Sequence, residues 1–279
     1  MQPRDLFHRY AAERKALELP GYRRDSVVGL TRHTPIAPHL DGIVMLAELT
    51  ERSAEGAILE QVHYFSGIGR DFEWKLHAFD TPADLMARLP RHGFTPGDAE
   101  ALMVYSVQGH ASVRMQSAMR YERIATLAGI RDVCCVQAEV WGEQLAWLES
   151  SLSASLPHTT IFCAYDSEKP VATGWIEFPP GSDFAELHGG AVLPEYRGRG
   201  IYSTIFSMRA EEARRRGTSF LAVDAAPMSR PILLQKGFAY VCETTPYRKP
   251  ANKAPEPTPT SVTNRAGARL APAAVVAHL

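Results

Sequence analysis

The residues around Gly198 and Gly200 have the types and the spacing of an anion-binding loop. Glycine tolerates positive φ and leaves neighbouring backbone N–H groups open to a ligand. An amphipathic helix is expected directly after the loop, and its first turn adds unsatisfied N–H donors at the positive end of the helix dipole. The amides of residues 198–203, assisted by Arg197 and Arg199, would therefore suit a phosphate or a diphosphate.

Other interpretations of this loop compete with that one. A Gly-x-Gly sequence is also common in plain strand–helix turns, in which the arginines would only be surface residues. A Walker loop requires Gly-Lys followed by Ser or Thr, whereas Ile201 and Tyr202 stand there. A dinucleotide-binding fingerprint requires a third glycine where Ser203 stands. The sequence disfavours both nucleotide motifs and leaves a simpler phosphate-binding loop or a structural turn.

Candidate proton-transfer residues precede the loop on an expected strand. Glu186 and His188 are two positions apart, so their side chains share one face of that strand. Either could be the general base, and Glu177 on the preceding strand is a third candidate. A hydrogen-bonded structural histidine and a solvent-facing carboxylate are the alternatives. Asp80 and Asp224 each begin a turn, where bonding to the local backbone is the favoured role.

Strands and helices are expected to alternate from residue 131 to residue 249. The predicted strands cover residues 160–165, 170–178, 184–193, 220–223 and 238–242, and the predicted helices cover residues 140–156, 201–216 and 229–235. The second of these helices ends on three arginines followed by Gly217, which are C-terminal signals. This order predicts the α/β (α+β) class, with a mixed central sheet flanked by helices.

A pattern of strand, short helix, Gly-Phe and strand occurs twice. Asp80 precedes Gly93 by 13 residues, Asp224 precedes Gly237 by the same 13 residues, and a phenylalanine follows each glycine. Coincidence is the alternative, because glycine often ends helices. A true repeat would make the protein a tandem of two related domains.

The stretch from Glu186 through Tyr240 resembles the GNAT acetyltransferase superfamily. The family's central motif, Gln/Arg-x-x-Gly-x-Gly/Ala, corresponds to Arg197-Gly198-Arg199-Gly200-Ile201-Tyr202. The usual lead-in corresponds to Val192-Leu193-Pro194-Glu195-Tyr196, and the second helix with its Gly-Phe ending corresponds to Ser229-Arg230-Pro231-Ile232-Leu233 and Lys236-Gly237-Phe238. The resemblance covers residues 131–249 and implies a GNAT-like fold, with the N-terminal half a second, degenerate copy or an accessory domain.

Three regions follow from these observations. Residues 1–130 are expected to form the N-terminal accessory domain, and residues 131–249 the catalytic GNAT domain. Residues 250–279 are rich in proline and alanine and contain no aromatic residue. Such a segment cannot bury enough apolar surface to offset its ordering entropy, so we expect a disordered tail.

The resemblance implies an N-acetyltransferase, an acyltransferase that moves an acetyl group from acetyl-CoA to an amine acceptor by direct attack. In such proteins the pantetheine pairs with the strand around Val192, a backbone N–H near Val192 binds the thioester carbonyl, and the amides of Arg199 to Ser203 bind the diphosphate. The implied coenzyme-binding residues are Val192, Leu193, Arg197, Gly198, Arg199, Gly200, Ile201, Tyr202, Ser203 and Ser229.

The chain departs from the family pattern at two positions. Tyr202 stands where Gly or Ala is usual, and Leu233 stands where many members carry a tyrosine as general acid for the leaving thiolate. Tyr240 or Tyr202 could replace that tyrosine, or the thiolate could leave unaided, since a thiol pKa of about 8.5 makes it a fair leaving group. The candidate catalytic residues are thus Glu186, His188 and Tyr240. A non-catalytic acyl-CoA-binding sensor or scaffold is the alternative function.

Composition limits the partners. Hydrophobic residues make up 45% of the 279 residues, and the net charge of −1 is not that of a nucleic-acid binder. We find neither an apolar run of membrane-spanning length nor an N-terminal signal, so the expected location is cytoplasmic. The four cysteines lack metal-site spacing, so we expect no metal. The expected partner is a small-molecule amine or a peptide amine, and a homodimer is compatible with the sequence.

Overall fold

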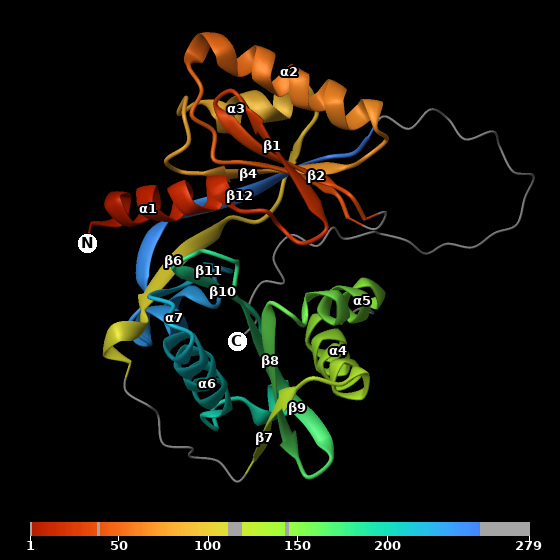
Figure 1. The fold of residues 1–279 in the computed structure, drawn as a ribbon, viewed down its shortest axis with the longest axis vertical. Helices are drawn as coiled ribbons and strands as arrows, with labels where there is room; N and C mark the ends of the chain where they lie inside the picture. The colour runs from red at the N-terminus through yellow and green to blue at the C-terminus, as the bar shows by residue number, and fades with distance from the viewer. Residues whose placement is uncertain (1, 38–39, 111–118, 143–144, 252–279) are drawn as a thin grey trace, which may run out of the picture. The chain divides into compact units, whose positions relative to one another are not determined.

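The computed structural model describes residues 2–37, 40–110, 119–142 and 145–251 (Figure 1). These residues form two compact units. Unit 1 contains the described residues of 1–17 and 100–243, and unit 2 contains those of 18–99 and 244–251. The division therefore does not follow the linear boundary expected near residue 130. Chain proximity alone cannot show such an arrangement, because strand pairing joins segments that are far apart in the sequence.

Unit 1 is built on a mixed sheet with the strand order β6-β11-β10-β9-β8-β7, and the first residues of β12 also belong to this unit. Its strands are β6 (Glu100–Ser106), β7 (Arg120–Ile124), β8 (Thr159–Asp166), β9 (Lys169–Glu177), β10 (Phe184–Val192), β11 (Phe220–Ala225) and β12 (Ala239–Lys249). Its helices are α1 (Pro3–Ala16), α4 (Leu127–Trp141), α5 (Ala146–Ser155), α6 (Ile201–Arg215) and α7 (Arg230–Gln235), with short 3₁₀ turns at Val107–Gly109 and Pro194–Tyr196.

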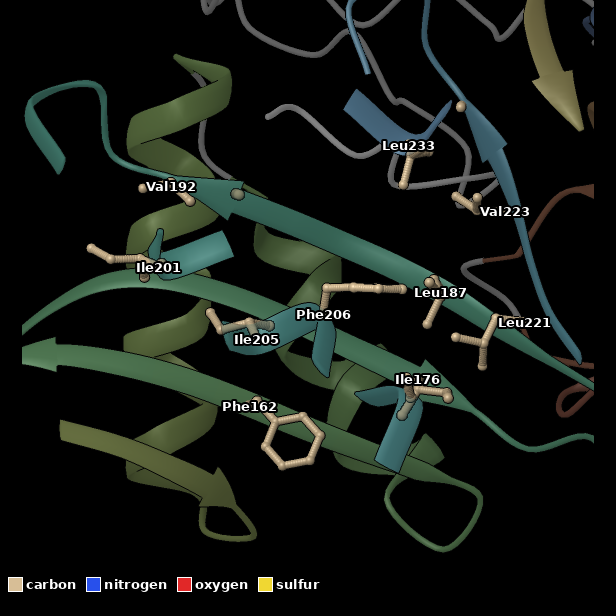
Figure 2. Close-up of a cluster of buried hydrophobic side chains, with 14 of the residues drawn as sticks. Phe162, Ile176, Leu187, Val192, Ile201, Ile205, Phe206, Leu221, Val223 and Leu233 are labelled. Atoms are coloured by element: carbon tan, nitrogen blue, oxygen red, sulfur yellow. The ribbon is translucent and has the colours of Figure 1, made fainter. Parts of the chain in front are cut away.

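Helices cover both faces of the unit 1 sheet. Helix α6 lies on one side of β8 and β9, and α4 and α5 lie on the other (Figure 1). The apolar positions of α6 recur with helical spacing, so Ile201, Ile205 and Phe206 point into one core together with Leu187 and Leu221 of the sheet (Figure 2). Burial of this apolar face is what holds α6, and hence the loop before it, against β10.

Unit 2 contains the strand order β1-β2-β3-β4 followed by the last residues of β12, and β5 pairs with β12. Its elements are β1 (Tyr22–Val27), β2 (Leu30–Pro35), β3 (Gly42–Met45), α2 (Glu51–Gly67), β4 (Phe72–His77), α3 (Leu85–Arg88), a 3₁₀ turn (Leu89–His92) and β5 (Thr95–Pro96). Helix α2 packs Ile58 and Phe65 against Val44 and Trp74 of the sheet.

The two units share one topology, as the repeated sequence pattern predicted. In unit 2, β1, β2 and β3 are antiparallel neighbours, and α2 connects β3 to the parallel strand β4. In unit 1, β8, β9 and β10 are antiparallel neighbours, and α6 connects β10 to the parallel strand β11. A short helix and a glycine with positive φ follow each time, at Gly93 (77°) and Gly237 (91°). The mixed α/β class and its tandem arrangement are confirmed.

One expected helix is interrupted in the structure. The single helix over residues 140–156 is wrong: α4 ends at Trp141, because Gly142 adopts φ 73° and donates its N–H to Ala138, and α5 begins only at Ala146. Apolar spacing alone did not reveal that the helix ends at this glycine.

The expected tail lies, from residue 252 onward, outside the described residues. Within the described part of the chain, no helix combines the length and the apolar character that a bilayer crossing demands.

Candidate active site

The loop between β10 and α6 has the backbone conformation that its glycines predict. Gly198 and Gly200 have φ of 75° and 76°, in the left-handed region where glycine carries no Cβ penalty. Gly200 is the N-cap of α6, and no side chain of the described residues caps the helix there. Among the described residues, the first amide after Arg197 with a backbone acceptor in this loop is that of Thr204, which donates to Gly200 O. The six amides of residues 198–203 therefore remain available to an anion.

The side chains around the loop leave it open. A Cβ atom at Gly198 would meet nothing within 4 Å. Arg197 is held by a hydrogen bond from Nε to Val192 O (3.1 Å), and Arg199 by one from Nη2 to Glu195 O (2.8 Å). Lys236, at the end of α7, donates to the hydroxyl of Ser203 in the first turn of α6. Arg197 and Arg199 belong to the loop itself, whereas Lys236, which contacts the first turn of α6, was not predicted from the sequence.

Several predicted coenzyme-binding residues have buried side chains. Val192, Leu193 and Ile201 are buried in the core of unit 1, and Leu193 N donates to Val171 O (2.9 Å). The phenol of Tyr202 lies near Arg209, and burial raises the pKa of Tyr202. Ser229 is fully buried at the start of α7, and its backbone N–H donates to Ala226. The bulky Tyr202 is therefore compatible with a loop that binds through amides.

Strands β10 and β11 separate beside this loop. They pair as parallel strands only over residues 184–186 and 220–222. Beyond that point β10 continues to Val192 and β11 to Ala225 with no further pairing between them. Leu187 and Leu221 mark the paired end in Figure 2, and Val192 marks the opposite end of β10. The unpaired edge of β10 can accept an extended, amide-containing chain such as pantetheine.

Titratable side chains gather on one face of β9 and β10. His188 Nε2 lies 3.8 Å from Glu177 Oε2 and 4.0 Å from Glu186 Oε2, and the imidazole stacks on Trp175. Because Glu186 pairs with Glu177, and His188 with Trp175, in the β10–β9 ladder, all four side chains share this face. Glu186 and His188, which the sequence placed on one face, are thus brought together.

Helix α1 adds two residues that sequence reasoning missed. Arg14 Nη1 forms an ion pair with Glu186 Oε1 (3.1 Å), and Tyr10 OH donates to the same oxygen (3.2 Å). Burial opposes the charge of Arg14, but Glu186, Asp224 and Glu177 outweigh that effect and raise the pKa of the guanidinium. Glu186 is therefore a half-buried, paired carboxylate and not a fully solvent-facing one. Arg14 and Glu186 are 172 positions apart in the chain, so no local sequence signal pointed to this contact.

A cavity opens at this cluster. It is lined by Tyr10, Glu186, Leu187, His188, Ala222, Val223 and Asp224, so it lies where β10 and β11 separate. Within the described residues, no three His, Cys, Asp or Glu side chains are placed to hold a metal ion. Asp80 of unit 2 accepts a hydrogen bond from the backbone of His77 (3.0 Å), which confirms its turn role. Asp224, its counterpart in the repeat, lies near the end of β11 and lines the cavity.

The candidate general acids lie elsewhere. Tyr240 on β12 is covered by the guanidinium of Arg230, 4.2 Å from the ring centroid, and it does not line the cavity. Leu233 on α7 is buried in the core of unit 1. Neither position places a hydroxyl donor in the cavity, whereas Tyr10 does so from α1.

Residues 125–229 match the model of the acetyltransferase (GNAT) family. No curated protein matches the chain significantly. Solved structures share the fold at low identity. A GCN5-related N-acetyltransferase from Kribbella flavida has a TM-score of 0.67 and 15% identity, and the match covers 87% of this chain and 96% of that one. A GCN5-related N-acetyltransferase from Sphaerobacter thermophilus has a TM-score of 0.60 and 14% identity, and the match covers 79% of this chain and 76% of that one. A tandem GNAT protein from the clavulanic acid biosynthesis pathway has a TM-score of 0.56 and 12% identity, and the match covers 86% of this chain and 86% of that one.

Residues 125–229 thus correspond to a GNAT acetyltransferase domain, and the fold of the chain also occurs in a tandem GNAT protein. The family match begins at residue 125, six residues before the boundary expected from the sequence, and so includes the start of α4 at Leu127.

Proposed function

We propose that this protein is an N-acetyltransferase that uses acetyl-CoA and acts on an amine, from a small molecule or a peptide. The observation that carries the proposal is the convergence, within unit 1, of three features. The six unpaired amides of residues 198–203 lie in the loop before α6 and in its first turn. An unpaired strand edge runs along β10, and a cluster of proton-accepting side chains lines the cavity between β10 and β11.

Each group of residues has its own proposed role in binding and catalysis. The amides of residues 198–203 hold the diphosphate, because hydrogen bonds to a charged group contribute roughly 1.5–3 kcal/mol each. Arg197, Arg199 and Lys236 add charge around them. The open edge of β10 orients the pantetheine toward the cavity. Acetyl-CoA supplies the acetyl group as a thioester, which the amine attacks directly. Orientation of the two reactants is then the main catalytic contribution of the protein.

His188 is the proposed general base. The carboxylates of Glu177 and Glu186 lie within 4.0 Å of its Nε2, so they stabilise the imidazolium that forms when His188 accepts the proton of the amine. Glu186 is less suited to take that proton, because Oε1 already binds Arg14 and Tyr10. Glu186 instead adds negative charge close to the histidine.

The leaving thiolate needs little assistance. The position usual for a tyrosine is occupied by the buried Leu233. A thiol with a pKa of about 8.5 is a fair leaving group near neutral pH. Tyr10, which lines the cavity and donates to Glu186, is an alternative hydroxyl donor to Tyr240.

Binding and turnover test the proposal separately. Saturating acetyl-CoA should raise the melting temperature by mass action. An amine panel with thiol detection should show release of free coenzyme A. His188→Gln should lower kcat by about 10²- to 10⁴-fold, as expected for loss of a general base, with an unchanged dissociation constant for acetyl-CoA. His158→Gln, an exposed position of unit 1, is the control. No thermal shift would refute coenzyme binding, and binding without thiol release would indicate the non-catalytic alternative.

A further inference from the structure

Strand β10 contains a bulge next to the candidate base. Its register with β9 shifts between His188 and Ala191, so β10 carries one residue more than β9 there. Gly189 adopts φ 56°, and a Cβ atom at this position would overlap the indole ring of Trp175. Only glycine fits both requirements. The bulge is thus a built feature of the strand that borders the cavity.

A buried glutamine of α4 binds the bulge. Gln137 is 0% exposed, and its Nε2 donates to Gly189 O (2.7 Å) and to Thr173 Oγ1 (2.6 Å). The Thr173 hydroxyl donates to the same carbonyl (3.0 Å). The indole of Trp141 donates to Gln137 Oε1 (3.0 Å). Every polar atom of the Gln137 side chain is therefore used in this network.

The network allows one orientation of the Gln137 amide. An indole N–H can only donate and a backbone carbonyl can only accept. A flipped amide would place Nε2 against the Trp141 donor and Oε1 against the Gly189 acceptor. Both bonds would then be lost around a buried side chain, where an unsatisfied polar group is destabilising. Trp141 thus holds Gln137, and Gln137 holds the carbonyl of Gly189.

Fixing this carbonyl also fixes the next amide. The peptide bond between Gly189 and Gly190 is trans, so its C=O and N–H point in opposite directions. The carbonyl points toward Thr173 of β9 and Gln137 of α4. The N–H of Gly190 consequently points away from the Thr173 and Gln137 side chains. Pairing of β10 with β11 has already ended before this point, at Glu186 and Ala222.

We propose that Gln137 is a positioning residue for acetyl transfer. It orients the Gly189–Gly190 peptide so that the N–H of Gly190 faces the space between β10 and β11 and donates to the carbonyl oxygen of the bound thioester. This inference rests on the proposed function and adds a residue from outside the loop and the cavity. A preorganised donor of this kind stabilises the negative charge that develops on that oxygen.

Three variants test the network. Gln137→Leu removes the donor to Gly189 at similar volume, and Thr173→Val removes one hydroxyl. Trp141→Phe removes the donor that orients Gln137 together with part of the ring that packs on the core. We expect kcat to fall about 100-fold, tenfold and threefold, respectively. The dissociation constant of coenzyme A should change less than twofold, since the diphosphate site is untouched. Val133→Ala, a buried change in the same helix outside this network, controls for lost stability.

Infrared spectroscopy supplies a readout that a purely structural role would not change. Acetyl-CoA labelled with ¹³C at the thioester carbonyl is bound without an acceptor. Its C=O stretch should shift to lower frequency in the wild type and in Val133→Ala, and return toward the free value in Gln137→Leu and Thr173→Val. An unchanged shift in a folded Gln137→Leu or Thr173→Val protein overturns the proposal. Absence of acetyl-CoA binding in the wild type instead refutes the proposed function.

Discussion

The two units of this protein share a topology but differ at the equivalent helix start. The N-cap of helix α6 is Gly200, which has positive φ, and the first turn of α6 contains no acidic residue. The N-cap of helix α2 is Thr50, whose side chain and that of Ser53 form a reciprocal capping box, and Glu51 occupies the first turn. The capping box consumes donors that an anion would need, and Glu51 repels negative charge. The same topology can therefore stabilise a helix end internally or keep it open for a ligand.

The parallel strand pairs, β3–β4 in unit 2 and β10–β11 in unit 1, also differ in how far their pairing extends. In unit 2 every residue of β3 pairs with β4, and the following segments remain joined because Leu49 N donates to Thr81 O (3.1 Å) and Thr81 N to Ala47 O (2.9 Å). In unit 1 the pairing of β10 with β11 stops after three residues. A closed ladder leaves no strand edge for pantetheine. We therefore expect one acetyl-CoA per chain, bound in unit 1.

Removing the glycines should have the largest effect. In a Gly198→Val/Gly200→Val double variant, bulky residues at positive φ would reshape the amide cradle. We expect affinity for acetyl-CoA to fall more than 100-fold in calorimetry, from a wild-type stoichiometry of one. Gly181→Val/Gly69→Val is the matched control, because these glycines also have positive φ (75° and 64°) and open surroundings. Equal losses in both doubles, or two sites in the wild type, would break the comparison.

Protonation of one carboxylate in each unit, Glu212 in unit 1 and Asp25 in unit 2, should lower the stability of the protein in acid. Burial opposes ionisation of Glu212, but hydrogen bonds from Arg215 and Arg216 lower the pKa of Glu212 to about 2. Since this folded-state pKa lies below the ordinary value of 4.5, the stabilisation is complete above about pH 5 and is lost as the pH falls toward 2. Glu212→Gln should cost about 2 kcal/mol at pH 7 and show a smaller fall in melting temperature between pH 7 and pH 3 than the wild type.

Asp25 is the unit 2 counterpart for this measurement. Burial opposes its ionisation as well, yet Arg23, Thr34 and Arg32 bind the carboxylate and lower the pKa of Asp25 to about 2. Asp25→Asn should therefore reduce acid sensitivity in the same pH window. If either variant retained the full wild-type pH dependence, its carboxylate would not anchor the unit.

A negative charge at the start of α6 should separate stability from binding. Ser203→Glu places a carboxylate in the first turn, where α2 carries Glu51. The helix dipole favours that charge, so the melting temperature should stay constant or rise slightly. Repulsion of the diphosphate should weaken acetyl-CoA about tenfold, or 1.4 kcal/mol. Ser203→Gln, which lacks the charge, should bind nearly as the wild type does. Equal binding by both variants would place the diphosphate elsewhere.

The smallest effect is expected at the capped helix. Thr50→Ala removes the capping box of α2 and should cost about 1 kcal/mol, which lowers the melting temperature by roughly 2–4 °C. Affinity for acetyl-CoA should not change. A change in affinity measured by calorimetry would show that the α2 start takes part in coenzyme binding, contrary to the contrast between the units.

The sequence alone predicted what short-range forces control. The positive φ of Gly198 and Gly200, the start of α6 at Ile201 and the repeated glycine at positions 93 and 237 all depend on neighbouring residues in the chain. The common face of Glu186 and His188 follows from the two-residue period of a strand. Sterics and periodicity act over a few residues, so these features could be read directly.

Only the tertiary structure decided the rest. Arg14 and Tyr10 reach Glu186 from the other end of the chain, β6 pairs with β11, and Gln137 binds the bulge at Gly189. Each contact joins segments whose proximity depends on how helices and strands pack. Hydrogen bonds and ion pairs between distant segments leave no periodic trace in the sequence, because any element with a compatible face can supply the partner.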